Sequence, residues 1–146
     1  MERRLIPPRA RRPHPRPRGG IATIGLALAL VIVFPLLFGL LEYGWMFLKS
    51  QEIAAAARDG ARIAATEGGT NALVNASIAQ AMTQAGLASS GYSVVTVPAN
   101  VTSAVPGTSV KVTVSVAYEG IALTSLPFIP TPTDLAGTTS MVKEGP

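Results

Sequence analysis

The sequence predicts an α+β protein in which a long N-terminal helix crosses a membrane and continues beyond it, followed by a second helix and a small antiparallel sheet of two to three strands. Three observations lead to this fold class. Residues 19–41 contain no charged side chain, and residues 45–66 are rich in alanine and lack proline. From residue 92 onward β-branched and polar residues alternate, with the period of two that is typical of strands.

The first twenty residues carry most of the positive charge. They hold seven arginines and one glutamate, a net charge of +6, whereas the remaining residues have five basic and seven acidic side chains, a net charge of −2. A basic head can neutralise nucleic-acid phosphates, but cationic residues directly before an apolar span hold that end of a chain in the cytoplasm. We therefore interpret residues 1–20 as a cytoplasmic leader that binds no nucleic acid directly, and expect the carboxyl terminus outside.

The uncharged run is long enough to span a bilayer. Its 23 residues extend about 35 Å as a helix, against a hydrocarbon core of about 30 Å, whereas a cleaved secretory signal has an apolar region of only about 7 to 15 residues. The run ends in Glu42, Tyr43 and Trp45, a combination of charge and aromatics typical of a membrane boundary. We expect a retained transmembrane helix over 21–41, with a kink or melted turn near Val31 to Pro35.

The helix is predicted to continue from Ile21 to Thr66 and to end at Gly68 and Gly69. Its outer half has an apolar stripe at steps of three to five residues, beside a polar face. The stripe consists of Leu48, Ile53, Ala56, Gly60 and Ile63, and the polar face of Lys49, Glu52, Arg58, Asp59 and Arg62.

A second helix is predicted from Asn71 to Leu87, with Leu73, Ile78, Ala81, Met82 and Ala85 on its apolar side. Two strands follow over 92–98 and 109–118; the second places the valines at 110, 112, 114 and 116 on one face. Residues 136–144 are a candidate third strand. With the outer half of the first helix, these elements make up an exported region over 42–146 that ends in a small β domain.

The composition argues against catalysis. The chain has no cysteine and a single histidine, His14, so the nucleophile–base pairs of hydrolases and thiolate metal sites lack a second member. A Ser–Lys dyad is formally open to Lys49, Lys111 or Lys143, but no local motif supports one. We assign no catalytic residue, no metal site and no cofactor, and interpret the protein as non-enzymatic.

Two blocks of sequence resemble the TadE-like family, the minor pseudopilins of the tight-adherence (Tad, Flp-type) pilus machinery. The first runs from Pro35 through Glu42-Tyr-Gly44, and the second is the AAARDGAR block that ends at Arg62. They are similar to the family's P…E-[FY]-G and A-A-R-[ED]-G-A-R blocks and together lie within about residues 20–66. The resemblance implies a bacterial structural or assembly subunit of a type IV pilus-related system for adhesion, surface attachment or DNA uptake.

The resemblance also implies partners and a processing site. The expected partners are the membrane, other pilin or pseudopilin subunits, the assembly platform and prepilin peptidase. The Gly19-Gly20 pair between a basic leader and the apolar helix has the layout of a prepilin cleavage site, so we expect a cut after Gly20 that leaves Ile21 as the mature start. The chain departs from the family at Gly25, where the family usually has a glutamate, and at Trp45, where an arginine often follows the E-[FY]-G block.

Four charged residues are the candidate interaction sites. Glu42 lies at the bilayer edge, where a carboxylate is costly unless it is wetted or paired, so we expect it to meet a basic group on a partner subunit. Arg58, Asp59 and Arg62 lie on the exported helix; the simpler interpretation of these three is a solvated face. Two other functions stay open: a single-pass signal-anchored envelope protein with a small extracytoplasmic binding domain, and an accessory subunit of a transporter.

Overall fold

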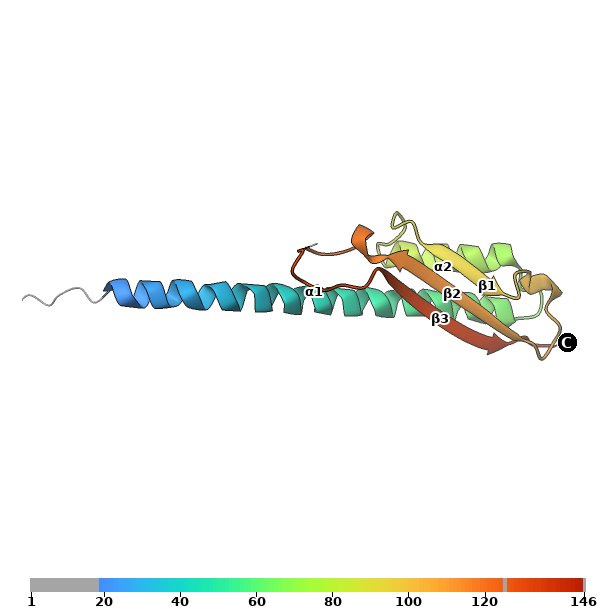
Figure 1. Cartoon of the computed structure of the whole chain (residues 1–146). Helices are drawn as coiled ribbons and strands as arrows, with labels where there is room; N and C mark the ends of the chain where they lie inside the picture. Colours follow the sequence, from blue (N-terminus) through green and yellow to red (C-terminus); the bar gives the residue numbers. More distant parts are fainter. Residues whose placement is uncertain (1–18, 125, 146) are drawn as a thin grey trace, which may run out of the picture. The chain divides into compact units, whose positions relative to one another are not determined.

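The computed structural model describes residues 19–124 and 126–145. Most of the basic leader, including His14, lies outside the described residues. The expected topology depends on the arginines of this leader, so it stays a prediction. The chain divides into two compact units between Leu36 and Leu37. The first unit consists, in its described part, of helix only, and the second contains the rest of that helix and every other element (Figure 1).

Helix α1 runs from Gly19 to Ala65 without interruption. It is long and apolar enough to cross a membrane, and its most apolar stretch is not buried by any other part of the described chain. Because Pro35 lies in regular helix, the expected melted turn is absent, and a bend at this position stays a prediction. The helix begins two residues before the predicted start and ends at Ala65, one residue before the predicted end and ahead of Gly68, whose φ is 77°.

Helix α2, Asn71–Gln84, begins with a side-chain cap. The Thr70 hydroxyl accepts a hydrogen bond from the backbone N–H of Leu73, which satisfies one of the free donors of a helix N-terminus. The helix buries Val74, Ile78 and Met82, a spacing of four residues that forms one stripe.

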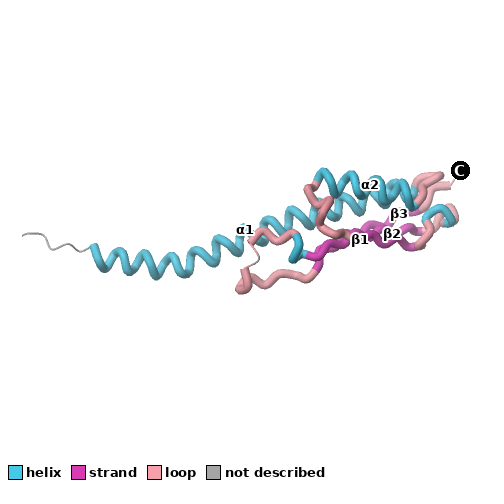
Figure 2. Tube along the Cα trace, turned by 90° about the horizontal axis from the view of Figure 1, so that it is seen from above, coloured by secondary structure: helices cyan, strands magenta, loops and turns pink. Residues whose placement is uncertain are grey.

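The sheet has three antiparallel strands in the order β1 (Ser93–Val97), β2 (Ser109–Ala117) and β3 (Asp134–Val142). The third strand, a candidate from sequence, is therefore present. Figure 2 shows the strands as one layer and the two helices as the other. As predicted, the alternate valines of β2 share one face of the strand, and all four are buried: Val110, Val112, Val114 and Val116.

Two glycines allow the sheet and α2 to approach α1 closely. A Cβ atom on Gly60 would lie 2.7 Å from Cδ1 of Ile78, and one on Gly137 would lie 2.6 Å from Cα of Ala54. The second contact is with backbone, which cannot rotate away. A glycine in β3 is therefore required by helix–sheet packing, whereas a Cβ atom on Gly60 would meet the side chain of Ile78, which would have to shift.

Three predicted side-chain positions are wrong. Leu48 and Leu73 were placed on apolar stripes but are 48% and 54% exposed, because the contacts with the sheet and between the helices select the neighbouring faces, with Val74 buried in place of Leu73. Lys49, placed on the polar face, is 7% exposed; its ammonium group finds acceptors inside the fold.

Candidate functional site: a buried glutamate where the apolar segment ends

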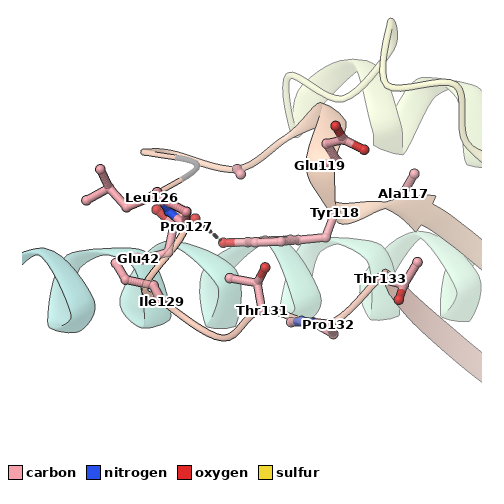
Figure 3. A pocket seen from close by; sticks show the side chains of 11 residues that line it. Glu42, Ala117, Tyr118, Glu119, Leu126, Pro127, Ile129, Thr131, Pro132 and Thr133 are labelled. Atoms are coloured by element: carbon pink, nitrogen blue, oxygen red, sulfur yellow. Dashed lines mark hydrogen bonds between the residues drawn. The ribbon is translucent and has the colours of Figure 1, made fainter.

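Glu42, the first charged residue after the apolar segment, is 1% exposed. Both of its carboxylate oxygens accept hydrogen bonds from the segment that follows β2. The Tyr118 hydroxyl and the Leu123 N–H donate to Oε1, at 2.5 and 3.2 Å. The Thr124 hydroxyl and N–H donate to Oε2, at 2.6 and 2.8 Å. Figure 3 shows the tyrosine pointing at the carboxylate.

These donors decide the charge state of the site. Burial raises the pKa of Glu42, but the hydrogen bonds from Thr124, Tyr118 and Leu123 together lower it by more, so the pKa lies below its ordinary value of 4.5. Burial, the hydrogen bond to Glu42 and the negative charge of Glu42 raise the pKa of Tyr118 above its ordinary value of 10.0. At neutral pH the pair is therefore a carboxylate and a neutral phenol.

Two aromatic residues of α1 bind the loop between the second and third strands, residues 121–133, which we call the connecting loop. The Tyr43 hydroxyl donates to the carbonyl of Pro130 at 2.9 Å, and the Trp45 indole N–H donates to the carbonyl of Ile121 at 2.8 Å. With Glu42, these residues make hydrogen bonds to the backbone near both ends of the loop. We call the three residues the Glu42 clamp.

Lys49 extends these contacts to α2. Its ammonium group lies 4.7 Å from the centroid of the Trp45 ring, and it donates to the carbonyl of Ala85 at 2.7 Å and to Oε2 of Glu52 at 2.8 Å. Ala85 follows the last residue of α2, where a helix presents the negative end of its dipole. The buried ammonium group of Lys49 is therefore compensated by Glu52 and the Ala85 carbonyl, without an acidic partner from the connecting loop.

A cavity of about 480 Å³ lies beside Glu42 and is lined by residues from the end of β2 onward, mostly from the connecting loop. Its wall is mostly apolar or uncharged, with Leu126, Pro127 and Ile129 among the lining residues, and with Glu42 and Glu119 as the only charged ones. Among the residues that the structure describes, no group of three or more metal-ligating side chains is present. The glutamate is already occupied by four donors, so the arrangement is one that holds a loop in place.

The other predicted site residues lie elsewhere. Arg58, Asp59 and Arg62 are exposed on α1, and the one ion pair within the described part of the chain joins Lys49 to Glu52. The three residues are thus not paired with one another. The candidate cleavage point after Gly20 lies in the first turn of α1.

The expected contact of Glu42 with a basic group of another subunit stays a prediction. In the structure, the donors to its carboxylate come from the same chain. Tyr118, Leu123 and Thr124 were missed because they lie 76 to 82 residues away in sequence. No local pattern marks them. Trp45 was recognised only as a membrane-boundary residue, and its bond to the loop was not predicted.

The fold and the clamp define a class: an α+β protein whose first helix provides both a candidate membrane anchor and one wall of the folded domain. The family model described as TadE-like protein matches residues 20–62, which confirms the resemblance over this stretch and associates the chain with Tad pilus components. Comparisons with curated proteins and with solved structures found no match.

Proposed function

We propose that the protein is a minor pseudopilin or assembly component of a Tad (Flp-type) pilus, with a structural role. The observation that carries the proposal is the combination of the family match over residues 20–62 with an apolar helix that no other part of the described chain covers. A bare apolar helix joined to a small packed domain suits a subunit that is stored in a membrane and assembles through helix contacts.

Processing is the first part of the proposal. A prepilin peptidase cuts after Gly20, so that Ile21 becomes the mature start and the arginine-rich leader stays behind. A Cβ atom on Gly25 would meet nothing within 4 Å, so the glycine in place of the family's glutamate is not required by packing within this chain. Losing the glutamate weakens contacts with the amino terminus of a neighbour rather than the cleavage itself.

The exposed charges of α1 are the second part. Arg58, Asp59 and Arg62 make no ion pair with one another and are accessible, so they are free to meet complementary charges on another pilin subunit or on the assembly platform. Exposed ion pairs contribute only about 0.2 to 1 kcal/mol each. They therefore select a partner's orientation rather than supply most of the affinity.

Two measurements test the proposal. Intact-mass spectrometry of the protein extracted from membranes should find a chain that begins at Ile21 in cells with active prepilin peptidase, and the full-length chain in cells without it. A photo-crosslinker at Asp59 in intact cells should form adducts with pilus subunits, whereas one at Lys111 on the outer sheet face should not.

A full-length chain in cells with active peptidase would favour the alternative, a static signal-anchored envelope protein with a small binding domain. The cavity beside the Glu42 clamp is the feature that such a protein would use. Loss of piliation on deletion of the gene, restored by the wild-type gene, separates the two functions, because an unrelated envelope protein leaves pilus assembly intact.

A further inference from the structure

The connecting loop has the composition of a segment that meets lipid. Its 13 residues, 121–133, include no charged side chain and contain three prolines. Two acidic residues, Glu119 and Asp134, flank it, and both are exposed. An uncharged loop of this length between charged ends is unusual on a surface that faces water only, because loops exposed to water are mostly polar.

The Glu42 clamp holds this loop where the apolar segment ends. Glu42 binds the N–H groups of Leu123 and Thr124, and Tyr43 binds the carbonyl of Pro130. Glu42 is also the first charged residue after the run that ends at Leu41. If the apolar helix spans a bilayer, the loop therefore lies at the bilayer surface.

The loop presents large apolar side chains to solvent at this level. Leu123 is 49% exposed and Phe128 is 58% exposed. On the helix, Leu41 before the clamp and Phe47 after it are exposed as well. Exposed apolar side chains thus lie on α1 before and after the clamp, and also on the connecting loop.

Part of the loop backbone needs no water, which matters where an unsatisfied N–H is costly. Three of its residues are prolines, which have no N–H to satisfy. Four of the others donate within the chain: Ile121 to Tyr118, Leu123 and Thr124 to Glu42, and Ile129 to Leu126.

We infer that the connecting loop is a second membrane contact, which inserts Leu123 and Phe128 into the interface of the bilayer that the apolar helix crosses. The inference rests on the membrane-anchor part of the proposed function and adds a lipid-binding surface to it. The partner is the acyl and headgroup boundary of the leaflet. Because the flanking charges are acidic, the loop enters through apolar contact and needs no anionic lipid.

A membrane contact of the loop explains why the anchored protein needs the Glu42 clamp. A carboxylate at the bilayer edge is costly when it faces hydrocarbon. The loop covers Glu42 and supplies three of its four donors, and in doing so it places the aromatic and aliphatic side chains toward the lipid. The protein thereby contacts the membrane at two places, the apolar helix and the connecting loop.

Site-directed spin labelling tests the inference, since the chain has no native cysteine. Single variants Leu123→Cys, Phe128→Cys, Lys111→Cys and Leu30→Cys of the full chain are labelled with a nitroxide and reconstituted in phosphatidylcholine vesicles. Lys111 lies on β2 about 23 Å along the chain from Tyr118, at about 3.3 Å per residue, and serves as the water-exposed control. Leu30 is the control inside the apolar helix.

Collision rates with oxygen, which concentrates in lipid, and with a water-soluble nickel chelate give the depth of each label. Labels at 123 and 128 are expected roughly 5 to 10 Å below the headgroups, the depth typical of interfacial segments. The label at 111 should be accessible to the chelate, and the label at 30 should be inaccessible. Unchanged Trp45 fluorescence verifies that the variants are folded.

Three outcomes overturn the inference in distinguishable ways. Chelate access at 128 equal to that at 111, with 30 protected, means that the anchor holds and the loop stays in water. Access at 30 as well means that the membrane anchor itself is wrong. Protection at 128 that disappears when the protein is diluted to about one chain per vesicle means that a neighbouring chain, rather than lipid, covers the loop.

Discussion

Replacing Glu42 with glutamine tests whether the clamp stabilises the fold. Glutamine keeps one acceptor oxygen, so it can still accept from two of the four donors, but its NH₂ group then faces the other two. The substitution therefore removes two hydrogen bonds to a buried carboxylate and weakens two more. Hydrogen bonds to charged groups contribute about 1.5 to 3 kcal/mol each, and such losses are not additive. We expect a loss of roughly 3 kcal/mol, out of about 5 to 15 kcal/mol for a domain.

The loss is measurable as a shift in thermal unfolding. For a domain of about 100 residues, 1 kcal/mol corresponds to about 4 °C or slightly more, so Glu42→Gln should lower the Tm by about 10 to 15 °C. Trp45 is the only tryptophan and bonds to the same loop, so its fluorescence in detergent micelles reports on the clamp directly.

Matched variants separate the clamp from a general effect of charge. Glu67 is exposed, so Glu67→Gln makes the same chemical change outside the clamp and should alter stability by less than about 0.5 kcal/mol. Tyr118→Phe should destabilise the protein, and the double variant with Glu42→Gln should lose less than the sum of the two. Equal Tm values for the Glu42 and Glu67 variants, or strict additivity, would refute the reasoning.

Three further predictions concern pH and packing. The folded pKa of Glu42 is lowered, so its stabilisation is complete above the ordinary value of 4.5 and is lost as the pH falls through the folded value; an acid titration of Tm should show this loss in the wild type and not in Glu42→Gln. Gly137→Ala should cost more than about 3 kcal/mol in chemical unfolding because its Cβ meets the backbone of Ala54, whereas Gly44→Ala, with nothing within 4 Å, should be neutral or gain up to about 1 kcal/mol of helix propensity. Lys143 donates to the carbonyl of Ala64 in the last turn of α1 and to that of Thr66, the residue after the helix. Lys143→Met should therefore lower the free energy of unfolding by about 1 to 3 kcal/mol, measured as a lower midpoint of urea unfolding; an unchanged midpoint would show that water replaces the cation.

Local patterns in the sequence were sufficient for the elements. The uncharged run, the alanine-rich stretch without proline, and the two glycines after it predicted α1 to within two residues at each end. The alternation in β2 predicted which valines are buried, because a strand places every second side chain on the same face. The two sequence blocks were sufficient for the family resemblance, which the family model then matched over residues 20–62.

Only the tertiary structure decided what the charged residues do. The sequence predicted that Glu42 needs a partner, but its donors come from a segment 76 to 82 residues later, and neither composition nor period records such a distance. Lys49 belongs to the polar face predicted for the helix, yet packing buries it against the carbonyl of Ala85, the residue after α2. The need for glycine at 137 likewise arises where β3 crosses the backbone of α1. Helical and strand periods come from interactions between near neighbours in the chain, whereas hydrogen-bond partners and close approaches depend on how separate elements pack.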